Sequence, residues 1–116
     1  MSEFVFLFRS SDDGRRAAMG TPDAAQRSLQ AWMAWIGNLE KNGHLKSRGA
    51  PLEASGKIVR SEMVTDGPFV EAKEMVLGFI IVEARDMAQA IELASDNPMV
   101  LGGGALEIRP VMSLGV

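Results

Sequence analysis

Two segments of the chain are apolar at nearly every position rather than at every second one. Residues 3–9 (EFVFLFR) and 74–83 (EMVLGFIIVE) are rich in aromatic and branched side chains, which is typical of β-strands. Successive side chains of a strand point to opposite faces of a sheet, so these two segments place apolar groups on both faces. We therefore expect them to be the central strands of a sheet that is buried on both sides.

A first helix is predicted between these strands, beginning after Thr21 and ending before Gly43. Thr21 is a suitable N-cap and Pro22 suits the first helical position, while glycine commonly follows a helix end. The helical spacing predicts a buried stripe with Met33 and Trp35 at its margins. The stripe consists of Leu29, Trp32, Ile36 and Leu39.

A second helix should begin at Asp86, because Gln89 follows at the spacing of a capping box. Its buried stripe is expected to comprise Met87, Ala90, Ile91 and Ala94. The glycines at 102–104 follow this helix and lack the lysine and hydroxyl residue of a phosphate loop, so we interpret them as a link. Residues 105–112 (ALEIRPVM) predict a last strand with Glu107 and Arg109 on its polar face.

The remaining segments have weaker patterns. Residues 10–20 (SSDDGRRAAMG) are predicted to be a polar loop, and residues 44–57 a loop that could hold a short strand. Residues 58–67 (IVRSEMVTDG) alternate weakly and indicate a strand or a hairpin arm. The resulting order is that of an α+β, ferredoxin-like β-α-β-β-α-β sandwich in one domain, residues 1–116.

Two helices can cover only one face of such a sheet. The other face would expose several hundred Å² of apolar surface, which at about 25 cal/mol per Å² costs several kcal/mol. We therefore expect a homodimer through the open sheet face, with the two sheets forming a dimeric α+β barrel. The alternative is that residues 44–60 fold over this face, but that segment is too polar to cover it fully.

Composition excludes several classes of function. The net charge of −3 and pI of about 5.1 disfavour nucleic-acid binding. The absence of cysteine excludes disulfides and thiolate metal sites, and a single histidine, His44, excludes a multi-histidine site, so we expect no metal and no cofactor. No apolar run approaches the roughly 20 residues of a membrane helix, and the first residues lack a signal-peptide pattern, so a cytoplasmic protein is expected.

Residues 66–74 read DGPFVEAKE and lead into the strand that contains Gly78. This run and the ending LEIRPVM resemble the DGPF signature and the last strand of the YCII-related family, and the resemblance spans nearly the whole chain. It implies a dimeric α+β barrel of mostly unestablished activity. For some relatives it implies a catalytic His–Asp pair, or an association with alternative sigma factors. This chain departs from the catalytic pattern, because its first helix has no histidine and His44 falls after Gly43.

Polar residues around the DGPF turn are the candidates for a ligand site. Asp-Gly-Pro forms turns and Phe69 can anchor this one, so the run could merely set the strand register. The functional alternative is that Asp66, Glu71 and Lys73 project into a cleft, with Arg109 either a surface charge or an anion clamp.

The predicted function is binding of a small organic ligand in a pocket near this turn. Cofactor-independent catalysis by carboxylate and lysine groups would use the same pocket. The alternative is a non-catalytic sensor or interaction module linked to transcriptional regulation.

Overall fold

The computed structural model describes residues 1–67 and 74–115, with the side chain of Asp12 outside this description. Its elements in chain order are β1 (Ser2–Ser10), α1 (Asp12–Met19), α2 (Pro22–Lys41), β2 (Leu45–Pro51), β3 (Gly56–Arg60), β4 (Met63–Gly67), β5 (Met75–Ala84), α3 (Met87–Ser95), α4 (Pro98–Leu101) and β6 (Ala105–Pro110).

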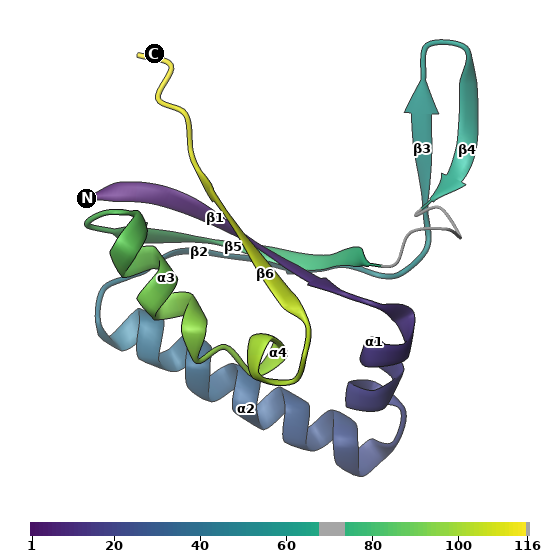
Figure 1. Ribbon diagram of the computed structural model, residues 1–116, viewed down its shortest axis with the longest axis horizontal. Helices are drawn as coiled ribbons and strands as arrows, with labels where there is room; N and C mark the ends of the chain where they lie inside the picture. The colour runs from purple at the N-terminus through teal and green to yellow at the C-terminus, as the bar shows by residue number, and fades with distance from the viewer. Residues whose placement is uncertain (68–73, 116) are drawn as a thin grey trace.

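The main sheet has four strands in the order β2-β5-β1-β6, and every neighbouring pair is antiparallel. This is the ferredoxin-like α+β fold expected from the sequence. The two apolar segments form the central strands β5 and β1, and β6 lies at an edge. Figure 1 shows α2 and α3 together on one side of the sheet, and none of the described helices lies on the other side.

The two faces of the sheet differ in burial. Every second residue of the central strands faces the helices and is almost fully buried, including Phe4, Phe6 and Phe8 on β1 and Ile80 and Val82 on β5. The intervening apolar residues on the opposite face are only partly buried: Val5, Leu7, Phe79 and Ile81. The strands are therefore apolar on both sides, but the described residues bury only one side fully.

Helix α2 has the predicted ends but a rotated buried stripe. The Thr21 hydroxyl accepts the Ala24 N–H at 3.1 Å, and Gly43 after the helix has a φ of 77°. Trp35, expected at the margin, is 5% exposed, and its indole N–H donates to the Leu93 carbonyl at 3.0 Å. Leu29, expected in the stripe, is 60% exposed. The expectation failed because the N-terminal half of α2 does not lie against the sheet.

Helix α3 has the predicted N-cap, and part of its predicted stripe was wrong. The Asp86 carboxylate accepts the Gln89 N–H at 2.9 Å. Ala90 is buried, and so is Ala94. Ile91 is 51% exposed, however, and Met87 38%. The contact with the sheet is narrow because the small alanine side chains let α3 approach closely.

The polar segment after β1 is a helix, not the predicted loop. Ser11 caps α1 by accepting the Gly14 N–H at 3.0 Å. Helix α1 packs against α2, where the Ser28 hydroxyl donates to the Ala18 carbonyl at 2.9 Å. Helix α1 was not recognised in the sequence because the helix has a glycine near its start and few large apolar residues.

The second strand of the main sheet is β2, within the predicted loop 44–57, and residues 56–67 form a separate hairpin, β3–β4. Strand β2 pairs irregularly with β5, so its sequence lacks alternation. Residues 45–51 also form an edge strand and do not cover the open face. Figure 1 shows the hairpin projecting from the sheet. The radius of gyration, 15.5 Å, accordingly exceeds the roughly 13 Å typical of this length.

We expect Gly49→Ala to destabilise the protein more than Gly43→Ala. Both glycines have positive φ, which costs other residues about 1–2 kcal/mol. A Cβ at Gly49 would also lie 1.9 Å from the Phe79 carbonyl oxygen, whereas nothing lies within 4 Å of one at Gly43. Urea unfolding should show a loss of about 1 kcal/mol for Gly43→Ala and about 2–4 kcal/mol for Gly49→Ala. Equal losses would contradict the close approach of β2 to β5.

Candidate functional site

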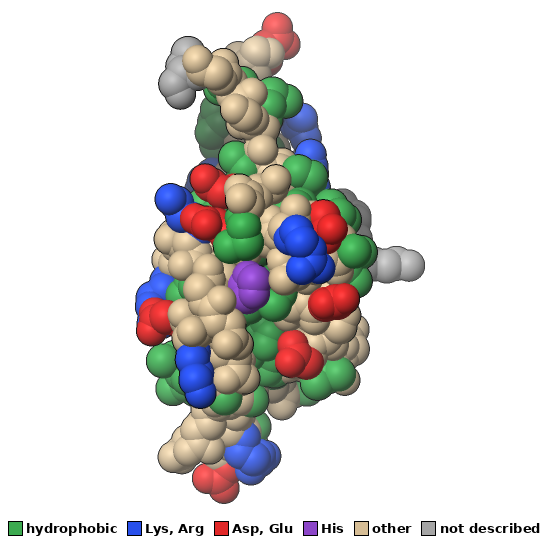
Figure 2. All heavy atoms as spheres, turned by 90° about the vertical axis from the view of Figure 1, so that its left-hand side faces the viewer, with side chains coloured by type: hydrophobic (Ala, Val, Ile, Leu, Met, Phe, Trp, Pro, Cys, Tyr) green, Lys and Arg blue, Asp and Glu red, His purple; other side chains and the backbone are tan. Residues whose placement is uncertain are grey.

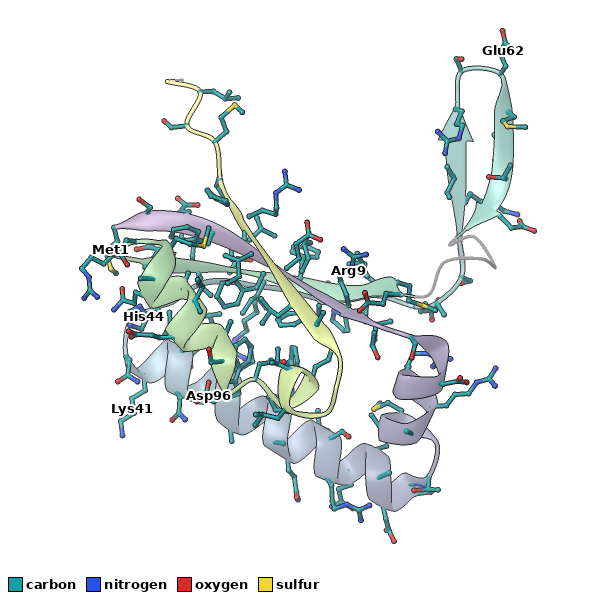
Figure 3. The ribbon with its side chains drawn as sticks, in the orientation of Figure 1. Met1, Arg9, Lys41, His44, Glu62 and Asp96 are labelled. Carbon is teal, nitrogen blue, oxygen red and sulfur yellow. The ribbon has the colours of Figure 1, made fainter. Side chains whose placement is uncertain are left out.

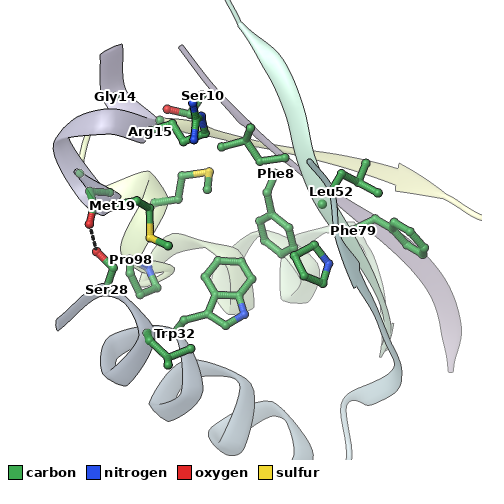
Figure 4. A pocket seen from close by; sticks show the side chains of 18 of the residues that line it. Phe8, Ser10, Gly14, Arg15, Met19, Ser28, Trp32, Leu52, Phe79 and Pro98 are labelled. Carbon is green, nitrogen blue, oxygen red and sulfur yellow. Dashed lines mark hydrogen bonds between the residues drawn. The ribbon is translucent and has the colours of Figure 1, made fainter. Parts of the chain in front are cut away.

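A cavity of about 880 Å³ lies between the sheet, α1, the N-terminal half of α2 and the link that follows α4. Its size falls within the range of small-molecule sites. Most of its wall is apolar, and a few polar side chains lie around it (Figure 4). These polar residues are Ser10, Ser11, Arg15, Ser28, Arg48 and Glu74.

The apolar wall is built on aromatic rings that contact one another. Phe8 of β1 meets Trp32 of α2 edge to face, with ring centroids 4.5 Å apart and an interplanar angle of 75°. The ring centroids of Trp35 and Trp32 are 5.4 Å apart. Trp32 is only partly buried because the cavity lies beside it. This arrangement offers a rigid aromatic surface to an apolar ligand.

One corner of the cavity is polar and is formed where β1 leads into α1. Ser10 ends β1 and is 8% exposed, and Ser11 is the N-cap of α1. Gly14 and Arg15 of α1 line the same corner. A Cβ on Gly14 would lie 2.6 Å from the Ser10 Oγ, so the absence of a side chain there keeps the corner open.

The glycines at 102–104 line the cavity wall after α4, whereas the sequence indicated only a link. Arg48 and Glu74 are also in the wall. The Arg48 Nη2 lies 2.6 Å from the Glu40 Oε2 in an exposed ion pair. Its charge is therefore already balanced outside the cavity.

Two of the five ligand-binding residues predicted from the sequence lie within the described part of the chain, and neither lines this cavity. Asp66 is in the hairpin, where its exposed carboxylate pairs with Lys57. Arg109 is on β6, and its Nη1 lies 3.3 Å from the Glu107 Oε2. The other three candidates, Phe69, Glu71 and Lys73, lie outside the described residues. The ligand-binding role of all five stays a prediction.

Sequence reasoning missed the residues that do line the cavity. Ser10, Ser11 and Arg15 were assigned to a loop, and Trp32 to the core. A serine followed by two acidic residues was the available signal, because it is typical of a helix start. No local sequence pattern indicates that the N-terminal end of α1 lines a cavity beside α2.

An ion cluster lies on the open sheet face. The Arg9 Nη1 is 2.7 Å from the Glu107 Oε1, and Arg109 binds the second oxygen. The hydrogen bond from Arg9, then that from Arg109, holds the pKa of the Glu107 carboxyl below its ordinary value. Figure 3 places Arg9 between the central strands and the base of the hairpin.

His44 is remote from the cavity lining and has a structural contact. Its Nδ1 lies 2.8 Å from the Glu83 carbonyl oxygen. Within residues 1–67 and 74–115, no group of three or more histidine, aspartate or glutamate side chains is placed to hold a metal, and no helix is long and apolar enough to cross a membrane. Figure 2 shows acidic and basic side chains intermixed on the face in view.

Comparison with known proteins identifies the family. A model of the YCII-related domain matches residues 4–114. The chain is also similar to an uncharacterised protein, R00369, of Rhizobium meliloti (strain 1021), with 38% identity over 53 residues. That match covers 42% of this chain and 40% of the relative, so it says little about the whole of either protein.

We expect Glu107→Gln to lower the free energy of unfolding at pH 7 and to have a smaller effect at pH 3. A carboxyl whose folded pKa is depressed contributes stability above its unfolded pKa, near 4.5, and loses it as the pH falls through the folded pKa. Urea unfolding at the two pH values measures the effect. Glu62→Gln at the hairpin tip (Figure 3) is the control for removing a surface charge and should cost less at pH 7. A loss that is equal at both pH values would show that the Arg9–Glu107–Arg109 cluster does not stabilise the fold.

Proposed function

This chain belongs to the YCII-related domain family, and we propose that it is a homodimeric protein that binds a small organic ligand in the cavity beside Trp32. The observation that carries the proposal is the cavity itself. It combines an aromatic wall with one polar corner, which is the usual composition of a ligand site. Glu74, the first described residue after the DGPF run, lines this cavity and supports a site near that turn.

Binding is better supported than histidine-based catalysis. Of the described residues that line the cavity, Glu74 is the single carboxylate and none is a histidine. His44 contacts the backbone of β5 instead. A ligand-binding sensor and an enzyme would use the same cavity, and the two differ in whether the bound ligand reacts.

The proposed dimer is supported by the open face of the sheet. Val5, Leu7, Phe79 and Ile81 form a contiguous apolar strip there, since Val5 pairs with Ile81 and Leu7 with Phe79. The described helices lie on the opposite side (Figure 1). A second copy packed sheet to sheet would bury this strip and remove its cost in water.

We expect Ile81→Lys to convert the dimer into a monomer. A lysine in the middle of the strip would place a charge in an apolar interface, and burying an unpaired charge is costly. Sedimentation equilibrium at micromolar concentration measures the mass. Ile91→Lys on the exposed side of α3 is the matched control and should remain dimeric. A folded wild-type protein that sediments as a monomer would contradict the proposed dimer.

We expect a thermal-shift screen of small organic metabolites to identify compounds that raise the melting temperature. A ligand at 100 times its Kd stabilises by about 2.7 kcal/mol, which corresponds to roughly 10 °C for a domain of this size. Trp32→Leu should reduce the shift to below about 3 °C, because it removes the aromatic wall. Leu101→Ala, a change at a residue 73% exposed, is the control and should leave the shift intact. A shift unaffected by Trp32→Leu would place the ligand elsewhere.

A further inference from the structure

The hairpin β3–β4 is a two-stranded sheet without a covering layer in the described part of the chain. Its strands pair with each other along their whole length, and no described helix or strand outside the hairpin makes extensive contact with them. A two-stranded hairpin on its own is only marginally stable in water, because it buries too little apolar surface. We therefore expect another surface to pack against it.

One face of the hairpin carries an exposed apolar pair. Val59 of β3 lies directly opposite Val64 of β4, so the two side chains are on the same face. They are 74% and 62% exposed. The next pair, Ile58 and Thr65, lies on the opposite face and is partly buried. The valine pair is therefore the part of the hairpin that is most open to another surface.

The hairpin points to the same side of the sheet as the apolar strip formed by Val5, Leu7, Phe79 and Ile81. Figure 1 shows β3 and β4 rising from one end of the sheet, on the side opposite α2 and α3. The strip faces this side as well, because the alternate residues of its strands are buried beneath the helices. A second copy that covered the strip would therefore lie beside the hairpin.

The hairpin is long enough to reach that second copy. Each of its strands has five residues, and at roughly 3.3 Å per residue they span about 16 Å. Two sheets that pack face to face lie only about 10 Å apart. The hairpin would therefore extend past the plane of the second sheet, and its side chains would lie against the end of that copy.

The area that a dimer needs also favours a contribution from the hairpin. A stable dimer buries about 800 Å² on each partner. Full burial of one large apolar side chain removes roughly 100–200 Å² from water. The four side chains of the strip are already partly buried, so the strip accounts for only part of this area. The valine pair adds apolar surface at the border of the strip.

We propose that the hairpin β3–β4 is an arm that packs its Val59–Val64 face against the second copy in the sheet-to-sheet homodimer. Because a two-fold axis relates the copies, each copy supplies one arm and receives one. This inference rests on the proposed homodimer and adds the segment that encloses the partner.

The test detects contacts between the copies directly. A dimer assembled from equal amounts of isotope-labelled and unlabelled full-length chain gives, in a half-filtered NOESY spectrum, only contacts that join the two copies. We expect such contacts from the methyl groups of Val59 and Val64, and also from those of Ile81 in the strip. The methyl groups of Leu101, which is 73% exposed on α4, are the internal control and should give none.

Two substitutions at Val59 measure what the arm contributes. Val59→Lys should raise the dimer dissociation constant about tenfold in sedimentation equilibrium, because it brings a charge into an apolar contact. Val59→Thr keeps the branched shape that suits a strand and should raise it about threefold. Leu101→Lys adds the same charge at an equally exposed site and should leave the dissociation constant unchanged.

The possible failures are distinguishable. Contacts between copies from Ile81 but from neither valine would overturn the arm and leave the dimer standing. Valine methyl groups that contact only their own copy would overturn it in favour of a hairpin that folds onto its own sheet. A dissociation constant unchanged in both Val59 variants would also contradict the arm. A monomeric wild-type protein with no contact between copies would show that the proposed dimer itself fails, and the arm with it.

Discussion

The packing of one face of β1 against the C-terminal half of α2 is the contact on which the rest of the structure depends. Phe4, Phe6 and Phe8 are almost fully buried there. Their partners on α2 are Trp35, Ile36 and Leu39, which are buried to the same degree. The Trp35 indole also donates to the carbonyl of Leu93 and so links α2 to α3. This core fixes both helices over one side of the sheet.

The cavity is a consequence of where this packing stops. On the N-terminal side of Trp32, the side chains of α2 no longer reach the sheet, and Leu29 is 60% exposed. Helix α1 and the glycine link after α4 border the space that remains. The same helix therefore provides a rigid core at one end and an aromatic wall for a ligand at the other, which explains why its two tryptophans have different surroundings.

The open side of the sheet combines an apolar strip with an ion cluster at its β6 edge. Val5 and Leu7 lie beside Arg109 and Glu107 in the register of β1 and β6. In the proposed dimer, the strip would supply the buried area. The Arg9–Glu107–Arg109 cluster would limit the ways in which two sheets can align, because a charged group tolerates only a geometry that keeps it paired or hydrated.

The fold was predictable to the extent that its signals are local. The central strands follow from unbroken apolar runs, and the ends of α2 and α3 follow from Thr21, Gly43 and Asp86. Strand β2 was anticipated only as a possible short strand within the loop 44–57, because its shifts in register remove the alternation on which strand prediction depends. The site was predicted less well than the fold. The candidates came from the charged turn at 66–73, whereas the described cavity is lined by residues distant from it in sequence, such as Ser10 and Trp32.

The sequence by itself determined the class of the fold, the positions of the central strands and both main helices, and the apolar character of both sheet faces. These properties depend on the order of side chains along each element. Only the tertiary structure decided that Trp35 is buried while Trp32 borders a cavity, and that Ser10, Gly14 and Arg15 form one corner of it. Those features depend on the angle at which α2 crosses the sheet and on where α1 returns to it, and no short stretch of the chain encodes either.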